Sequence, residues 1–426
     1  PILGGWLADR WLGQRRAVLV GGIVMALGHF AMAVPALLHL ALGLLVAGNG
    51  FFKPNISTIV GALYARDDAR RDAGFTLFYM GINLGAFLAP LVCGTLGELF
   101  GWHYGFAAAG VGMVLGLTVF VRGQEKLGTA GLPPRRAEPG MRLVPRDWAT
   151  VAVTALAAVA VVATVVYSWP HAGGWWEALD PLTQLALGLA LVAASVGAGR
   201  IARSRREHAE PLSRIERERI AALAVMALFV VFFWMGFEQA GGTMNLFADR
   251  QTDRLILDWE MPASYFQALN PLLILLLAPL FSALWTRLDR SRHALSSVAK
   301  QGWGMIILGL GFVVLAVADE RARQLGVVGP LWLAAVYLLH TIGELCLSPI
   351  GLSMVTRLSP ARLVSLLMGL WFTAMAAANY LAGTLEQILQ GSGLPLYWFL
   401  VGSSVGAGAL LLLLSPALGR LMHEAR

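Results

Sequence analysis

The sequence predicts an all-α protein whose helices cross a membrane many times. Of its 426 residues, 57% are hydrophobic and only 13% are charged, whereas a soluble domain carries about 25% charged residues. Apolar runs of roughly 20 residues recur along the chain, and a helix of that length can cross a bilayer. Basic residues gather in alternate connections between these runs, as they do in polytopic membrane proteins.

Twelve apolar segments, separated by proline, glycine and charged clusters, are predicted to be the spanning helices. The connection 65–72 is short and strongly charged, 122–147 contains the irregular sequence LPPRRAEPG, and 200–219 is rich in arginine. The expected spans are 17–38, 40–64, 73–97, 103–121, 148–169, 181–199, 217–247, 261–286, 298–318, 330–354, 364–389 and 396–419.

The distribution of basic residues predicts the orientation of the chain. If the residues before the first span are cytoplasmic, the alternate connections and the C-terminus are cytoplasmic too, and they carry nearly all of the Lys and Arg. Apart from Lys53 within a span, the opposite side holds only Arg250, Arg254, Arg321 and Arg323. The net charge of +7 is therefore interpreted as an orientation signal, and no nucleic-acid partner is expected.

The two cysteines, Cys93 and Cys346, each lie inside an apolar run without any ligand-like spacing. They predict neither a disulfide nor a metal site, so no metal or cofactor is expected. The chain begins at Pro1 rather than Met, which suggests that further residues precede it.

Three ionisable residues lie well inside predicted spans: Lys53, Glu238 and Glu344. Each would cost at least about 2.5 kcal/mol if it faced lipid, so each is expected to face a cavity or a partner. A structural ion pair between helices is one explanation. Two acids and one base cannot all neutralise one another, however, and one acid that remains free to titrate is what a proton-coupled carrier requires.

The surroundings of these residues favour a cavity. Pro54 follows Lys53, and Ser348–Pro349 follows Glu344, so breaks are expected in both helices; irregular helices at mid-membrane often line water or solute. Trp234 lies four residues before Glu238, on the same helical face. Polar groups at similar depth, each of which could instead form a helix–helix hydrogen bond, are Asn83, Asn270 and Asn379.

Several motifs carry a family resemblance. GGWLADRWLGQRR (4–16) resembles the loop after the second helix of the major facilitator superfamily. GNGFFKPNISTIVGALY and DAGFTLFYMGINLGAFLAPLVCGTLGE resemble the two signatures of the proton-dependent oligopeptide transporters. FFWMGFEQAGG, QALNPLLILLLAPLFSALW and GELCLSPIGLSMV are similar to that family's seventh, eighth and tenth helices. The sequence is identified as a bacterial-type member.

The resemblance implies a major facilitator fold with two helical bundles and an inserted two-helix hairpin. It implies that helix one and most of helix two are absent from this chain. The expected parts are an N-terminal bundle (1–121, end of helix two to helix six), a cytoplasmic linker (122–147), the transmembrane hairpin (148–199), a basic cytoplasmic linker (200–216) and a C-terminal bundle (217–426, helices seven to twelve).

The resemblance also implies roles for individual residues. Lys53 and Glu344 match a lysine and a glutamate that face each other across the central cavity, where Glu344 meets the amino terminus of a peptide and Lys53 its carboxylate. Glu238 matches a carboxylate of helix seven used in proton coupling, in which Lys53 also takes part. The remaining residues that match substrate-binding positions are Asn83, Asn270, Trp234 and Trp371.

The function expected from these features is proton-coupled symport of di- and tripeptides, and of peptide-like drugs, by alternating access. The alternative on the same fold is a carrier for another small anion, such as nitrate or a glucosinolate-like compound, or for a drug. An enzyme is not expected, because HExxH does not occur and no two histidines lie at ligand spacing. The expected partners are peptides, protons as the coupling ion and the lipid bilayer. The chain is expected to be a monomer in the bacterial inner membrane.

Overall fold

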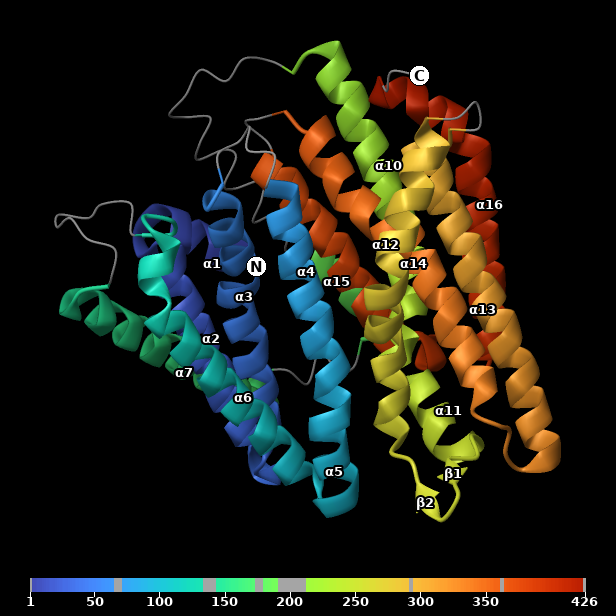
Figure 1. Ribbon diagram of the computed structural model, residues 1–426, viewed down its shortest axis with the longest axis horizontal. Coiled ribbons are helices and arrows are strands. Elements are labelled where there is room, and N and C mark those ends of the chain that lie inside the picture. The colour runs from blue at the N-terminus through green and yellow to red at the C-terminus, as the bar shows by residue number, and fades with distance from the viewer. Residues whose placement is uncertain are drawn as a thin grey trace. The chain divides into compact units, whose positions relative to one another are not determined.

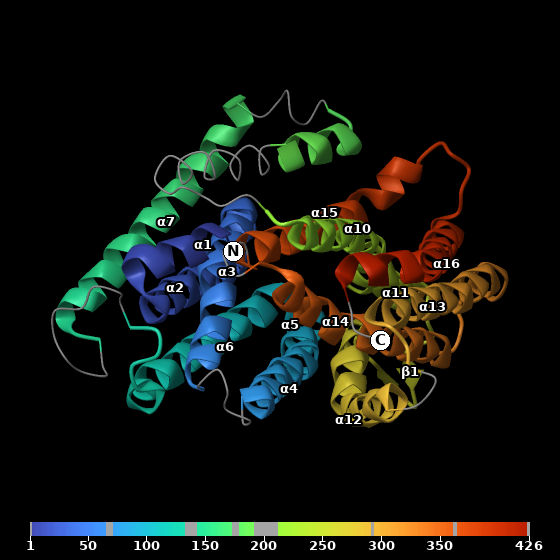
Figure 2. The same ribbon diagram turned by 90° about the horizontal axis from the view of Figure 1, so that it is seen from above.

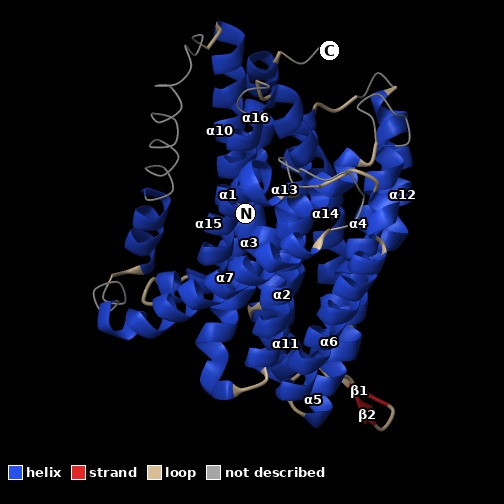
Figure 3. Cartoon of the chain, turned by 90° about the vertical axis from the view of Figure 1, so that its left-hand side faces the viewer, coloured by secondary structure: helices blue, strands red, loops and turns tan. Residues whose placement is uncertain are grey.

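The computed structural model describes residues 2–64, 71–132, 143–172, 179–190, 212–290, 294–360 and 364–423. The chain divides into two compact units, Pro1–Glu177 (unit 1) and Ala178–Arg426 (unit 2). Apart from helices and an isolated β-bridge between Thr252 and Val328, the described residues form a two-stranded antiparallel hairpin of β1 (Leu255–Ile256) and β2 (Trp259–Glu260) (Figure 3). Predicted features that lie outside the described residues are most of the 65–72 connection, most of LPPRRAEPG, residues 191–199 of the hairpin and the arginines of 200–211.

Unit 1 is a helical bundle in which α2 packs against α3, α6 and α7 (Figure 1). A Cβ built on Gly21 of α2 would lie only 2.6 Å from the carbonyl oxygen of Gly48 in α3, so the two backbones approach as only small residues permit. The helices are α1 (Ile2–Leu7), α2 (Gln14–Met32), α3 (Leu38–Ala62), α4 (Arg71–Ala89), α5 (Thr95–Phe100), α6 (Trp102–Arg122) and α7 (Pro145–Ala172), with short π or 3₁₀ turns at Ala8–Leu12, Pro35–Leu37, Pro90–Gly94 and Gln124–Leu127.

The segment 4–16, which resembles a loop between helices, is mostly helical and turns at Gly13, where a buried arginine holds it. Gly13 has a φ of 74°, which glycine adopts without the steric cost that a Cβ would add. Arg15, fully buried, follows it. Its Nε donates to the carbonyl of Ala130 and its Nη2 to that of Gly128, each at 2.7 Å. The turn is thereby joined to the segment after α6, more than 100 residues later in the chain.

Unit 2 contains the larger hydrophobic core, in which α13 lies beside α14 and α16 (Figure 2). A Cβ on either Gly304 or Gly343 would lie 2.7 Å from the other residue's carbonyl oxygen, so α13 and α14 are in close backbone contact. The elements are a helix at Pro181–Ala190, α10 (Arg214–Phe237), a 3₁₀ turn η5 (Glu238–Gly241), α11 (Thr243–Gln251), a 3₁₀ helix η6 (Ala263–Ala268), α12 (Leu269–Asp289), α13 (Ser297–Leu325), α14 (Leu331–Leu358), α15 (Val364–Leu389) and α16 (Leu396–Met422).

Within the described residues, nine helices are long and apolar enough to cross a membrane, and the chain is a multi-pass membrane protein. The breaks expected near Lys53 and Glu344 are both wrong, because α3 continues as helix through Pro54 to Ala62 and α14 through Pro349 to Leu358. Neighbouring helices let a membrane helix tolerate such a proline. The break lies in the seventh predicted span instead, at η5. That segment reads EQAGG, and paired glycines weaken a helix because they lose the most conformational entropy on ordering.

Candidate functional site

Glu344 of α14 is the buried acid around which polar groups of unit 2 gather. Its residue is only 7% exposed. Asn270, near the start of α12, donates from Nδ2 to Glu344 Oε2 at 2.9 Å and lies 3.1 Å from Thr341 Oγ1. A carboxylate removed from water needs such donors. The amide carries no charge, however, so the negative charge of an ionised Glu344 is not neutralised by Asn270.

The geometry of this group follows from local helix structure. Thr341 and Glu344 are three residues apart on α14 and therefore lie on one face. The Thr341 hydroxyl donates to the carbonyl of Tyr337 at 2.7 Å, which leaves its oxygen able to accept from Asn270. Asn270 precedes Pro271 in the first turn of α12, where a helix does not need the N–H that proline lacks. Thr341 was not predicted from the sequence; its spacing from Glu344 is the signal that could have identified it.

Glu238 lies at the break between α10 and α11, where its side chain is exposed. The neighbouring Gln239, which sequence reasoning missed, is 2% exposed and holds the break in place. Its Nε2 donates to the carbonyls of Met235 and Ala382, both at 3.2 Å, and its Oε1 accepts from Thr243 at 2.8 Å.

The two predicted aromatic residues differ in burial. Trp234 is half-buried and makes edge-to-face contacts with Phe233 and Phe237, at centroid distances of 5.6 and 5.2 Å. Trp371 is 4% exposed and belongs to the core of unit 2. Its indole packs on α14 so closely that a Cβ on Gly351 would lie 2.8 Å from it.

Lys53 of α3, in unit 1, has an exposed side chain directly before Pro54. Pro54 lies inside the helix, and the hydroxyls of Ser57 and Thr58 donate to the carbonyls of Lys53 and Pro54 at 3.2 and 2.9 Å. Asn55, which follows, is buried and donates to the carbonyls of Phe51 and Gly4 at 2.8 and 3.3 Å. The helix is therefore anchored around the exposed ammonium.

Asn83 of α4 is 6% exposed, and its Nδ2 donates to the carbonyl of Tyr79 at 3.0 Å, within its own helix. Unit 1 thus carries Lys53 and Asn83, while the structure brings Asn270 and Glu344 into direct contact in unit 2. Asn379 of α15, noted from the sequence, is exposed. Among the described residues, His, Cys, Asp and Glu form no group of three or more that could hold a metal ion.

The chain resembles proteins of known kind over nearly its whole length. The family model described as "PTR2: POT family" matches residues 15–394. The chain is 38% identical to the peptide transporter YePEPT of Yersinia enterocolitica over 99% of this chain and 84% of that protein. It is 30% identical to a di-/tripeptide transporter of Lactococcus lactis, over 100% of this chain and 85% of the other.

The fold agrees with these sequence matches. A crystal structure of a peptide transporter POT in complex with sulfate superposes with a TM-score of 0.79 at 37% identity. The match covers 99% of this chain and 84% of that structure.

Proposed function

The chain belongs to the POT family, and from this premise we propose that it is a symporter that imports di- and tripeptides together with protons. The observation that carries the proposal is the buried Glu344 with its amide donor Asn270 inside a membrane-spanning bundle. The names of its relatives, a peptide transporter and a di-/tripeptide transporter, support the substrate class. The acids and amides near Glu344 support a solute with a positive end.

Glu344 binds the amino terminus of the peptide in this proposal. Asn270 orients the carboxylate through a bond 2.9 Å long, and the hydrogen bond it makes to Thr341 limits its own rotation. An ammonium that reaches Glu344 supplies the positive charge that the amide cannot. Charge-assisted hydrogen bonds are shorter and roughly twice as strong as neutral ones, so the carboxylate favours an ammonium over a neutral group.

Lys53 binds the carboxylate of the peptide. Its exposed ammonium on an anchored helix suits it to a ligand that arrives from water. Asn83, Trp234 and Trp371 complete the proposed substrate-binding set; the amide offers a donor and an acceptor, and the aromatic rings offer apolar surface to varied side chains.

Glu238 exchanges the coupled proton, with Lys53 sharing in the coupling. The 3₁₀ turn, which exposes the carboxylate, and Gln239, which fixes the turn, support this role. In this proposal, a proton on Glu238 leaves Glu344 ionised to bind the ammonium of the peptide, since two like charges in one site disfavour each other. This couples proton binding to ligand binding without any cofactor. The proposed location is the bacterial inner membrane, with the linkers and the C-terminus in the cytoplasm.

The direct test is uptake of labelled dialanine into proteoliposomes that contain the full-length protein, with and without an inward proton gradient. We expect accumulation only with the gradient. Lys53→Ala should abolish accumulation because it removes a charge needed for coupling, while the protein remains folded as judged by size-exclusion chromatography. Lys126→Ala, which removes an exposed lysine outside the spans, is the matched control. Accumulation that does not depend on the gradient would contradict symport.

A further inference from the structure

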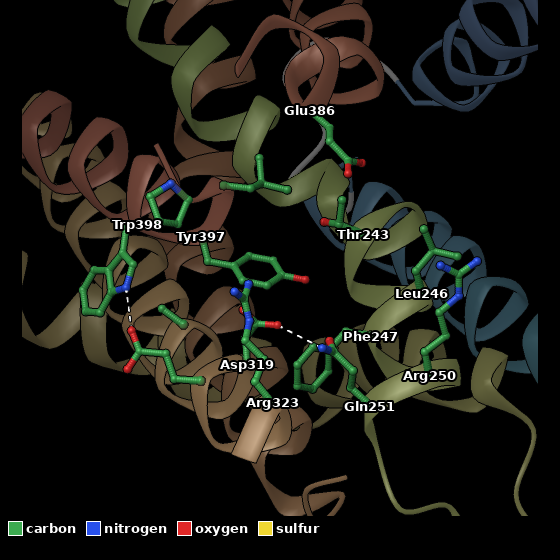
Figure 4. A pocket seen from close by; sticks show the side chains of 14 residues that line it. Thr243, Leu246, Phe247, Arg250, Gln251, Asp319, Arg323, Glu386, Tyr397 and Trp398 are labelled. Carbon is green, nitrogen blue, oxygen red and sulfur yellow. Dashed lines mark hydrogen bonds and ion pairs between the residues drawn. The ribbon is translucent and has the colours of Figure 1, made fainter. Parts of the chain in front are cut away.

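Unit 2 contains a cavity of about 390 Å³ that is separate from the Glu344 group (Figure 4). It lies where α11, α13 and α15 end and α16 begins, away from the end of the unit that carries Arg214 and His423. None of the substrate-binding or proton-coupling residues discussed above lines it. Its volume falls within the roughly 300–1,000 Å³ of ligand sites.

One side of the cavity is held together by hydrogen bonds and an ion pair. Asp319, 9% exposed, accepts from Gln251 at 3.1 Å and from Arg323 at 3.1 and 2.7 Å. Tyr397, which also lines the cavity, meets Phe247 edge-to-face at a centroid distance of 6.4 Å. Asp319 and Arg323 neutralise each other, whereas Glu320, which also lines this side, keeps a negative charge and accepts from the indole of Trp398 at 3.1 Å.

Two further charges at the cavity are not balanced in this way. Glu386 of α15 and Arg250 of α11 both line it and are exposed, and neither has a hydrogen bond or ion pair with another described residue. In the view of Figure 4, Thr243 and Leu246 lie between them. The cavity therefore presents a free carboxylate and a free guanidinium, separated by a small polar and a small apolar side chain.

We propose that this cavity binds a small zwitterion, with its ammonium at Glu386 and its acidic group at Arg250. Two separated charges of opposite sign select a ligand that carries both, and guanidinium pairs well with carboxylate or phosphate oxygens. Tyr397 and Phe247 supply apolar surface for the remainder of the ligand. A free peptide and the headgroup of phosphatidylethanolamine share this chemistry. The site adds a second binding position to the proposed transport function.

An occupant of the cavity would also touch the segment that follows the helix break. Thr243, a lining residue, donates to Gln239, the residue beside Glu238 that holds η5 to α15. The second site is therefore connected by one hydrogen bond to the turn that carries the proposed coupling acid.

The test measures protection of a cysteine placed in the cavity of the full-length protein. Cys93 and Cys346, both free, are replaced by Ser, and Leu246→Cys provides an accessible thiol on the lining. The protein is purified in a maltoside detergent, and the rate of its reaction with a charged maleimide is measured with and without saturating dialanine. We expect dialanine to slow the reaction several-fold, and N-acetyl-dialanine amide, which lacks both charges, to have no effect.

Variants separate direct protection from an indirect effect. Glu386→Gln and Arg250→Gln should each remove the protection, whereas Glu344→Gln should retain it. A cysteine at Leu257, 91% exposed and outside the lining, should react at the same rate with and without dialanine. Unchanged labelling at Leu246→Cys in every condition, or protection that is lost only with Glu344→Gln, would overturn the site.

The lipid composition of nanodiscs distinguishes a peptide from a lipid headgroup as the bound zwitterion. Protection without added peptide in nanodiscs of phosphatidylethanolamine, but not in nanodiscs of phosphatidylglycerol, assigns the site to the lipid headgroup; protection by dialanine in phosphatidylglycerol assigns it to peptide. Labelling reports binding alone. If the full-length protein shows this protection but no gradient-driven uptake, the transport proposal is refuted and the second site is retained.

Discussion

At the scale of single residues, the main feature is a carboxylate that accepts a hydrogen bond from a neutral amide and has no ion pair with another described residue. Glu344 is buried, and the neutral amide of Asn270 donates a hydrogen bond to it. A buried ionised carboxylate is costly unless it is paired. A ligand ammonium relieves this cost. This is the physical reason to place the amino terminus of the peptide at Glu344, while the coupled proton is assigned to Glu238.

Glu344→Gln should therefore weaken the binding of free dipeptides far more than that of amino-terminally acetylated ones. The loss of a charge-assisted hydrogen bond costs about 2 kcal/mol, which corresponds to a roughly thirty-fold loss of affinity. Competition against labelled dialanine in proteoliposomes measures both ligands. Glu125→Gln, an exposed residue outside the spans, is the matched control. Equal losses for the free and acetylated peptides would contradict the proposed orientation of the ligand.

At the scale of elements, the interrupted span α10–η5–α11 differs most from a regular helix. Gln239 bonds to α15 through the Ala382 carbonyl and to α11 through Thr243, so the turn is fixed on both sides. Short 3₁₀ stretches within a helix often mark a functional hinge. The exposed Glu238 is the acid proposed to exchange the proton. The adjacent Gln239 is buried and holds the turn in place.

Gln239→Leu should destabilise the protein by roughly 1–3 kcal/mol, because it leaves buried carbonyls without their donor. We expect the midpoint of thermal unfolding in detergent to fall by a few degrees. Gln387→Leu, at an exposed position of α15, should leave the midpoint unchanged. If both variants unfold at the wild-type temperature, the Gln239 bonds are not important for holding the break.

At the scale of the whole molecule, the basic residues predict how the chain is oriented in the membrane. The β1–β2 hairpin falls on the predicted outer side and Lys126 on the predicted cytoplasmic side. Both Leu257, at the tip of the hairpin, and Lys126 are exposed and can report accessibility.

In a background with both native cysteines replaced, Leu257→Cys should react with a membrane-impermeant maleimide on intact cells, and Lys126→Cys should react only after the membrane is permeabilised. The positive-inside rule requires this result because basic connections remain in the cytoplasm. The reverse pattern would show that the orientation is wrong, and labelling of both positions on intact cells would show that the cells leak.

The sequence by itself determined the helical membrane class, because apolar length and the internal hydrogen bonds of a helix are local properties. It also pointed to Glu344 and Asn270 as residues of interest, through polarity in an apolar setting and through resemblance. Only the tertiary structure decided that these two side chains bond, since they lie 74 residues apart. It likewise decided that Arg15 closes a turn on carbonyls more than 100 residues away. Such bonds depend on how helices pack, and the break at EQAGG rather than at Pro349 depends on which helices have neighbours able to support an irregular backbone.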